Sequence, residues 1–356
     1  MDTMTLLALT KYSKAGASSR YRFYNYQKYF KKEGITMTIS PLLTQKYLES
    51  TNKYNKILII CLAYLKRFFL IVNILIKPKK YDVLLIEYEL FPYVPAWFEF
   101  LLSKRGINYS VDYDDAIFHK YDKHILLKNK IAKVMRYADK VIVCNAYLEE
   151  YARKHNQNIF MIPTVVLLDK YKEAIQEKKY LKHHSFVIGW IGSRTTSPYI
   201  LEILFILELF MKKYDDVVLH LVGFDVLLLK NKTPKIKVIP WNQNTEIEEI
   251  LNFDIGIMPL RDDAWARGKC AFKLIQYMSA KKPVIASNVG MNCSLVEEGI
   301  NGYTVSSDEA WFEALEKLYK DKSLRERMAK NNFAKIEKSY NHAIHAKYYS
   351  QILKGI

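Results

Sequence analysis

The chain has 356 residues, of which 50% are hydrophobic, so a disordered protein is excluded and two domains are the default expectation. Its 54 lysines and arginines exceed its 37 aspartates and glutamates, and the formal charge of +17 favours phosphate-bearing partners: nucleic acid, an anionic membrane or a sugar nucleotide. The four cysteines form no close pair, so neither a zinc site nor a disulfide framework is predicted, and a reducing cytoplasm is the simplest location.

The first half of the chain predicts a series of short strands separated by helix-sized segments. The N-terminus, "MDTMTLLALTKYSKAG", lacks the basic and long apolar regions of a secretion signal and predicts a first strand instead. The strands expected here are "TLLALT", "ITMTISPL", "DVLLIEYE", "INYSVDYDD", "KVIVCN" and "IFMIPTVV". Such alternation is typical of parallel α/β units.

The nearest approach to a membrane span is the apolar segment 57–76, between the second and third of these strands. It is long enough to cross a bilayer, but Lys66 and Arg67 stand at its middle and argue against a crossing. The preferred interpretation is a buried or half-buried helix. The alternative is a helix in the membrane plane, flanked by the basic residues 77–80.

Acidic side chains gather where the fourth strand ends. The stretch "DYDD" places Asp112 and Asp114 on one side of an extended strand and Asp115 at its end. Acids near a buried strand end are costly unless they are solvated, paired or used in chemistry. We predict a catalytic role for these three, in which one orients or deprotonates an acceptor hydroxyl. The structural alternative is a helix cap together with pairing to Arg20 or Arg22.

A charged stretch at 169–184 predicts the domain boundary, so we expect domains at 1–182 and 183–338 and a closing helix at 339–356 that returns to the first domain. The second domain repeats the pattern with "FVIGWIGS", "VVLHLVG", "IKVIPW", "DIGIMPL" and "KPVIAS". We therefore predict an α/β protein of two doubly wound domains, whose sheets would present their C-terminal ends to a central cleft.

The stretch "RGKCAFKLIQYMSAKKPVIASNVG" predicts a helix at 272–280 with an apolar side that faces the core and a polar side that can bind a ligand. Lys273 and Gln276 share the polar side, and cations including Lys269 precede the helix. A helix N-terminus flanked by cations is a natural phosphate site. Lys273 is the first candidate for a diphosphate and Gln276 for a ribose, with Lys269 second. A solvated basic helix start is the alternative.

Two more residues are candidates for donor binding. Arg194 follows the strand and glycine turn of "GWIGS", a setting for backbone contact with phosphate. Trp241 ends a strand and could cover a base or simply fill the core. No metal site is predicted, because the adjacent acids Asp262 and Asp263 lack the spacing of metal ligands.

The order of these motifs resembles the two-domain GT-B glycosyltransferases of family 4 (group 1), the bacterial surface-polysaccharide type. The resemblance covers most of the chain and rests on "SSRYR", "VDYDDAIFHKYD", "VIGWIGSRTT", "FDIGIMPL", and the helix stretch followed by "VEEGINGYTV". It implies the GT-B fold, donor binding without a metal, and retention at the anomeric carbon. Acceptor-side candidates are Ser19, Arg20, Arg22, Glu87, Glu89 and His119.

One departure from the family pattern concerns a pair of glutamates that many members carry at the ends of a seven-residue spacer. The matching positions here are Gly268 and Gln276. A role that needs a carboxylate at position 268 is therefore in doubt. Donor binding is not, because a glutamine amide can hydrogen-bond ribose hydroxyls.

We expect a cytoplasmic enzyme, with a peripheral position on the inner face of the plasma membrane as one option. It would move a sugar from a nucleoside-diphosphate donor, UDP-linked by preference, to a saccharide or lipid-linked saccharide. One alternative is a sugar-nucleotide epimerase of the same fold. The other is a basic protein that binds membrane or nucleic acid and has a degenerate sugar site. Nucleic acid is not expected as a partner, because that interpretation depends on charge alone.

Overall fold

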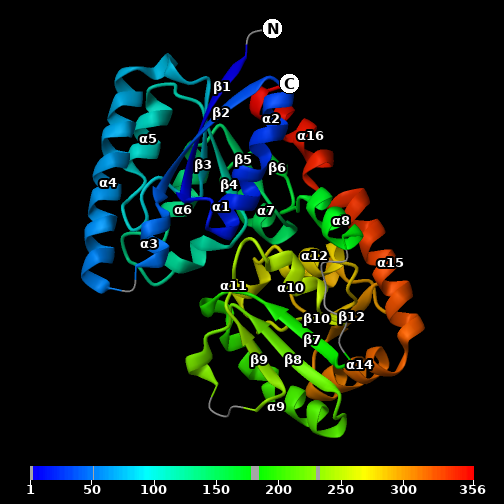
Figure 1. The fold of residues 1–356 in the computed structure, drawn as a ribbon. Coiled ribbons are helices and arrows are strands. Elements are labelled where there is room, and N and C mark those ends of the chain that lie inside the picture. The colour runs from blue at the N-terminus through cyan, green and yellow to red at the C-terminus, as the bar shows by residue number, and fades with distance from the viewer. Residues whose placement is uncertain (1–2, 51, 178–183, 230–232) are drawn as a thin grey trace. The chain divides into compact units, whose positions relative to one another are not determined.

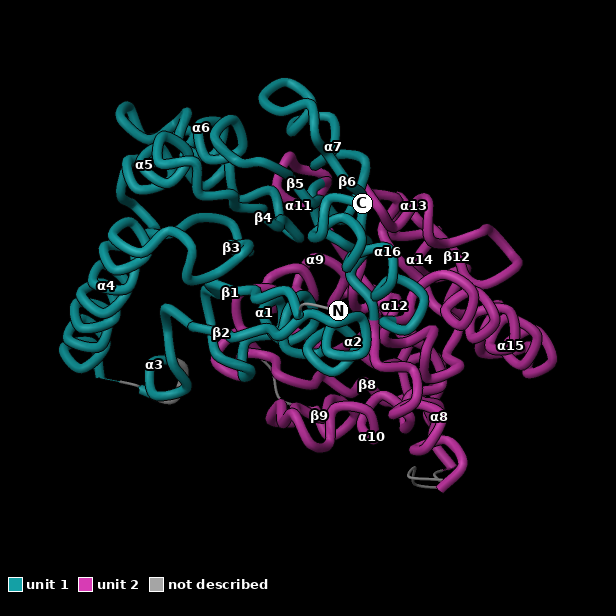
Figure 2. Tube along the Cα trace, turned by 90° about the horizontal axis from the view of Figure 1, so that it is seen from above, with its two compact units in different colours: residues 1–165, 268–270, 342–356 teal, residues 166–267, 271–341 magenta. Residues whose placement is uncertain are grey.

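The computed structural model describes residues 3–50, 52–177, 184–229 and 233–356. The chain forms two compact units, coloured separately in Figure 2. Unit 1 comprises Met1–Val165, Gly268–Cys270 and His342–Ile356, and unit 2 comprises Val166–Arg267 and Ala271–Asn341.

Unit 1 contains a six-stranded parallel sheet in the order β2-β1-β3-β4-β5-β6 (Figure 1). Every residue of β3 and β4 is buried, as expected for parallel strands covered on both faces, and this explains the apolar run VLLI that begins β3. The strand order reverses between β1 and β3, which is where doubly wound sheets bind ligands. The strands are β1 Met4–Tyr12, β2 Ile35–Leu43, β3 Val83–Glu87, β4 Tyr109–Tyr113, β5 Lys140–Val143 and β6 Ile159–Met161.

The helices of unit 1 include the closing helix of the chain, which returns to this unit as predicted. Tyr349 on this helix donates to Asp112 at 2.9 Å, and Lys354 donates to the carbonyl of Glu33 at 2.5 Å. The helices are α1 Ala17–Arg22, α2 Gln27–Lys32, α3 Gln45–Glu49, α4 Lys53–Ile76, α5 Trp97–Lys104, α6 Lys130–Tyr137, α7 Ala146–Arg153 and α16 His342–Lys354, with short 3-10 turns η1 Tyr24–Tyr26, η2 Pro78–Lys80 and η3 Ile117–Tyr121.

The structure shows a helix over segment 57–76 that is buried on one side only. This segment lies in α4, at the edge of unit 1 beside α5 (Figure 1), and only 17% of its most apolar part is buried. Leu58, Leu65 and Phe69 are each more than half exposed. An apolar composition indicates a helix but does not indicate which side is covered; the half-buried form of the prediction holds, because Arg67, Ile71 and Ile74 are buried while the opposite side is exposed.

Unit 2 contains a second six-stranded parallel sheet, in the order β12-β11-β10-β7-β8-β9. The strands are β7 Phe186–Ile191, β8 Val217–Val222, β9 Ile236–Ile239, β10 Ile255–Met258, β11 Val284–Ser287 and β12 Gly302–Val305. The first five of these confirm predicted strands. The sixth, "GYTV", was not predicted, because it is a short edge strand with a glycine and two half-buried residues rather than an apolar run.

Helices cover both faces of this second sheet. They are α8 Leu168–Gln176, α9 Pro198–Lys213, α10 Glu246–Leu251, α11 Ala264–Arg267, α12 Phe272–Ser279, α13 Met291–Leu295, α14 Asp308–Lys320 and α15 Lys322–Ser339, with 3-10 turns η4 Arg194–Thr196 and η5 Val226–Leu228. The helix predicted at 272–280 is α12.

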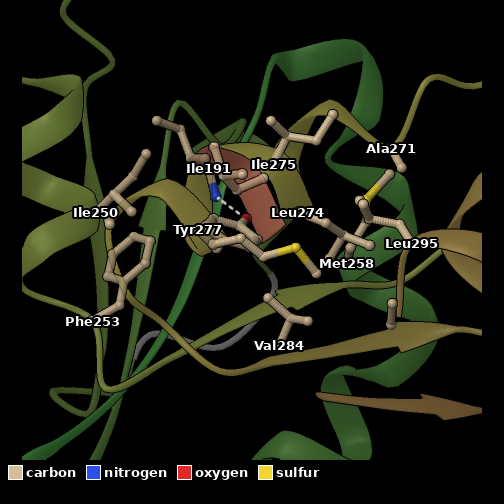
Figure 3. Packing of buried hydrophobic residues seen from close by; sticks show 14 of the residues in the cluster. Ile191, Ile250, Phe253, Met258, Ala271, Leu274, Ile275, Tyr277, Val284 and Leu295 are labelled. Carbon is tan, nitrogen blue, oxygen red and sulfur yellow. Dashed lines mark hydrogen bonds between the residues drawn. The ribbon is translucent and has the colours of Figure 1, made fainter. Parts of the chain in front are cut away.

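The core of unit 2 fixes α12 against the sheet (Figure 3). Leu274, Ile275 and Tyr277 are fully buried, and the Tyr277 hydroxyl accepts a hydrogen bond from the backbone of Ile191 at 3.0 Å. A Cβ atom at Gly256 would lie 2.3 Å from the Tyr277 ring, so this strand position must be glycine for the helix to pack closely. The polar side of α12, which carries Lys273 and Gln276, is thereby held in one orientation.

The boundary of unit 1 lies at Val165 and not at the expected residue 182. Helix α8 belongs to unit 2, because Leu168, Tyr171 and Ala174 pack into the same core as α12. Val166 also pairs with Asn341, so both ends of unit 2 meet at one bridge. Part of the predicted linker, 178–183, lies outside the described residues.

Candidate active site

The start of α12 in unit 2 is the first part of the candidate site. Ala271 precedes the helix with φ +50°, a left-handed conformation that is uncommon for a residue with a side chain. Among the described residues, no side chain caps this helix. Strained backbone and an N-terminus without a side-chain cap are features of anion sites.

Lys273 lies in the first turn of α12, with its ammonium 5.7 Å from the centroid of the Trp190 ring. Trp190 belongs to β7 and is 1% exposed, so it is a fixed platform. A cation held over an aromatic face loses less freedom when it binds a phosphate. Gln276, the candidate for a ribose contact, follows one turn later on α12 and is 5% exposed.

Two glycine turns follow β7 and β8 next to this platform. A Cβ atom at Gly192 would fall 2.3 Å from the Trp190 ring, and one at Gly223, where φ is +76°, would fall 2.3 Å from the Gly192 carbonyl. Both positions therefore need glycine. They bring bare backbone to the C-terminal ends of two neighbouring strands, as phosphate-binding turns require.

The other predicted donor residues of unit 2 flank these turns. Arg194 is exposed in η4, where it lies between Ser193 and Thr196, the two residues of a capping box. Trp241 is half-buried, lies within 3.1 Å of the Gly223 Cβ position, and donates its indole N–H to Glu246 at 3.1 Å. Both therefore lie near the turn region.

Gly268 and Lys269 belong to unit 1, unlike the other donor candidates. Asn145, at the start of α7, donates to both of their carbonyl groups, at 3.1 and 3.2 Å. A Cβ atom at Gly268 would lie 2.3 Å from the Ala116 Cβ. The space that the first family glutamate would need is therefore already occupied.

Glu87 lies at the C-terminal end of β3, beside the point where the strand order reverses. One carboxyl oxygen accepts from Ser19 at 2.6 Å and from the backbone of Lys11 at 2.7 Å. The other, Oε1, is buried and has no hydrogen-bond partner among the described residues. Burial raises the pKa of Glu87 to about 8, against the opposing effect of these hydrogen bonds. Its neutral form can donate a proton or a hydrogen bond.

Asp112, opposite Glu87 in the sheet, forms a buried bidentate ion pair with Arg22, at 2.8 and 2.7 Å. Tyr349 donates to the same carboxylate. Burial raises the pKa of Asp112, while the Arg22 guanidinium acts in the opposite direction. This arrangement is the pairing considered as the structural alternative, and it connects α1, β4 and α16.

Asp114 is also buried and accepts a hydrogen bond from the hydroxyl of Tyr88. Tyr88 has φ +64°, a strained conformation at the end of β3. Asp115 is half-buried, which makes it the most accessible member of the predicted acidic set. Glu87, Asp112 and Asp114 therefore gather at one end of the sheet, each with a different partner.

The remaining acceptor-side candidates lie in other arrangements. Glu89 forms an ion pair with Lys130 and accepts a hydrogen bond from Tyr121 at 2.8 Å, and all three side chains are buried. His119 contacts Asp122 and Tyr147, each at 2.8 Å. Arg20 is buried, and its guanidinium stacks 4.8 Å from the Tyr21 ring.

The residues that the sequence interpretation missed are Trp190, Lys11 and Tyr88. Lys11 is half-buried and places its ammonium 5.6 Å from the Tyr88 ring. Trp190 is the tryptophan of the motif "GWIGS", but its place in an apolar strand indicated only a residue of the hydrophobic core. Strand alternation could not show which distant side chain lies above it.

Both units have the doubly wound parallel architecture of the GT-B fold, and solved structures of that class match the whole chain. They include a glycosyltransferase from Rickettsia africae (17% identity, 100% of this chain and 99% of that one, TM-score 0.68) and sucrose-phosphate synthase from Thermosynechococcus elongatus (14%, 99% and 98%, 0.70). A third is HepE of Anabaena in complex with UDP and glucose (14%, 99% and 100%, 0.68).

Sequence comparison identifies the same class in unit 2. Residues 185–321 match the family model described as "Glycosyl transferases group 1". No curated protein sequence shows significant similarity to the chain. The family match over residues 185–321 indicates a glycosyltransferase, and the solved structures show that the whole chain has the GT-B fold. This finding favours the transferase over the epimerase and the non-enzymatic alternative.

Proposed function

We propose that the protein transfers a sugar from a UDP-sugar to a saccharide or lipid-linked saccharide acceptor during cell-surface polysaccharide synthesis, with retention at the anomeric carbon. The observation that carries the donor part is the position of Lys273 over Trp190, at the start of α12 and near the glycine turns after β7 and β8. This arrangement combines a held cation, backbone amides and a helix N-terminus.

The chemistry of the donor explains why such an arrangement is useful. Cleavage of the glycosidic bond leaves negative charge on the diphosphate, and a preorganised cation stabilises that charge. Lys273 would supply it, Gln276 would bind the ribose, and Arg194 would approach from η4. No metal is needed in this proposal, because the cations neutralise the leaving group themselves.

Two observations favour uridine as the base of the donor nucleotide. The structure of HepE from Anabaena was solved with UDP and with UDP-glucose, on a fold that aligns with 99% of this chain. Trp241 is placed beside the Gly223 turn, where an aromatic side chain can cover a base. UDP is therefore the nucleotide to test first.

Retention is supported by the state of the acids in unit 1. An inverting transfer needs a carboxylate that takes the proton of the acceptor hydroxyl. Asp112 is engaged by Arg22, Asp114 is engaged by Tyr88, and the pKa of Glu87 is about 8. Asp115 is half-buried, and we assign it to orienting the acceptor.

The experiment that tests this function is sugar transfer followed by proton NMR. A thermal-shift screen of nucleotides and sugar nucleotides first identifies the donor that stabilises the protein. The selected donor is then incubated with saccharide and lipid-linked saccharide acceptors. We expect a glycoside with the anomeric configuration of the donor; an inverted product would contradict retention, and stabilisation by purine nucleotides alone would contradict UDP.

A further inference from the structure

Helix α4 of unit 1 exposes an apolar stripe along its length. Tyr54, Leu58, Leu62, Leu65, Phe69 and Ile76 are 82%, 61%, 49%, 53%, 65% and 71% exposed. Their spacing of three, four or seven residues places them on one side of a helix with 3.6 residues per turn. This helix is also the one described helix long and apolar enough to cross a membrane.

The opposite side of α4 is attached to unit 1. Arg67 is 3% exposed and donates to the carbonyl groups of Thr10 and Ser40, at 3.1 and 2.7 Å. Tyr64 donates to the carbonyl of Pro92 at 2.7 Å. A crossing helix would have to break these bonds and carry Arg67 into lipid, which is costly. The helix therefore stays on the protein, with its stripe facing outward.

The apolar surface continues from α4 onto α5 and a neighbouring loop. Phe68 of α4 packs against Phe98 of α5, at 5.8 Å between ring centroids. Trp97 and Leu101 on α5 are 64% and 43% exposed. Tyr93, 57% exposed, lies 6.0 Å from the ring of His124, and the next residue in that loop, Ile125, is 91% exposed. Exposed tryptophan and tyrosine beside apolar side chains are typical of a membrane interface.

The charge around this surface is positive. The sequence from 53 to 81 contains no aspartate or glutamate, and Glu99 of α5 is buried. Basic side chains on α4, η2 and α5, or directly after these helices, are exposed at Lys53, Lys66, Lys77, Lys79, Lys80, Lys104 and Arg105. Such residues attract the anionic headgroups of a bilayer and can extend past apolar neighbours to reach them.

We propose that the surface formed by α4, α5 and residues 93 and 125 docks in the plane of a bilayer that contains anionic lipid. The apolar stripe inserts at the level of the headgroups, and the lysines contact lipid phosphate. This inference goes beyond the proposed function, because it depends on neither the donor nor the acceptor. It places the enzyme where lipid-linked substrates are found.

A second copy of the chain fits this surface less well. A two-fold dimer brings the same patch of both copies together, so each basic rim would face another basic rim. Like charges placed opposite each other oppose association. A lipid surface has the complementary charge.

The first test is flotation of the full chain with vesicles of phosphatidylcholine alone or with phosphatidylglycerol added. We expect binding to the anionic vesicles that weakens with salt, as screening requires. The variant Leu58→Ser/Leu62→Ser/Leu65→Ser should bind about tenfold less or worse. The matched control is Leu201→Ser/Phe205→Ser/Leu209→Ser on α9 of unit 2, where the three side chains are 36%, 66% and 41% exposed; it should bind like the unchanged protein.

The second test uses Trp97, the one tryptophan in the sequence of unit 1. Vesicles with brominated anionic lipid should quench tryptophan emission, and Trp97→Phe should lose most of that quenching while it still floats with vesicles. Three results would overturn the proposal: equal binding of the stripe and control variants, quenching that survives Trp97→Phe, or a dimer in light scattering that only the stripe variant dissociates. Lys273→Ala should bind vesicles normally, so failure of the donor site and of membrane docking can be distinguished.

Discussion

Lys273 and Trp190 illustrate how single residues acquire a role from fixed neighbours. The ring is buried in β7, so the lysine above it has a defined position before any phosphate arrives. The protonation state of Glu87 is likewise set by its surroundings. Burial raises its pKa to about 8, and Oε1 accepts no hydrogen bond among the described residues, so the side chain is neutral near pH 7. Neither state can be read from the sequence, because each depends on residues far along the chain.

Glu87 should make the stability of unit 1 depend on pH. Its pKa in the folded protein, about 8, is above the ordinary value of 4.5, so the folded state holds a proton that the unfolded state has released. The free energy of unfolding should therefore fall as pH rises from 4.5 to 8. Glu87→Gln, which keeps a neutral side chain, should flatten this slope in urea titrations. An unchanged slope would show that Glu87 is charged throughout.

Asp112 should contribute to stability more than to chemistry. Asp112→Asn leaves Arg22 buried without its counter-charge and should lower the free energy of unfolding by about 3–5 kcal/mol. Asp122→Asn, which removes an exposed partner of His119, should cost about 0–1 kcal/mol. Activity per folded molecule should be similar in both variants. Loss of transfer in well-folded Asp112→Asn would return this residue to the catalytic set.

At the scale of elements, the strands were predictable and their surroundings were not. A strand that is buried on both faces tends to be an apolar run, as in the first four residues of β3, VLLI, and such a run is visible in the sequence. Helix α4 was predicted as a buried or half-buried helix, but the sequence did not indicate that one whole side of it is exposed. The candidate site was predictable only in part. The periodicity of α12 indicates its apolar and polar sides, but the partner of Asp112 lies on α1, far away in the sequence, and could not be predicted.

The contact between α12 and β10 can be tested at Gly256. Gly256→Ala would place a methyl group 2.3 Å from the Tyr277 ring, and the ring is confined by the core. We expect a loss of about 1–3 kcal/mol in the free energy of unfolding, as for other overpacked sites. Urea denaturation followed by circular dichroism measures it. Stability equal to that of the unchanged protein would mean that α12 is not held as closely as described.

At the scale of the whole molecule, the proposed donor site and the proposed membrane surface lie in different units. Unit 2 contains α12 and the glycine turns, to which we assign donor binding, and carries the match to group 1 glycosyltransferases. Unit 1 presents the acids of β3 and β4 and the apolar stripe of α4. The high positive charge of the chain is compatible with both proposals, because a diphosphate and a lipid headgroup are both anionic.

The most direct test of the donor assignment is calorimetric titration of UDP into the full chain and two lysine variants. Lys273→Ala removes the ammonium 5.7 Å from Trp190, and the control Lys317→Ala removes one 5.6 Å from Tyr303 on the same unit. We predict that Lys273→Ala binds UDP at least about tenfold more weakly at an unchanged melting temperature, a loss of about 1.4 kcal/mol or more, while Lys317→Ala binds like the unchanged protein. Unchanged affinity in a correctly folded Lys273→Ala protein would contradict the assignment of α12 as the diphosphate site.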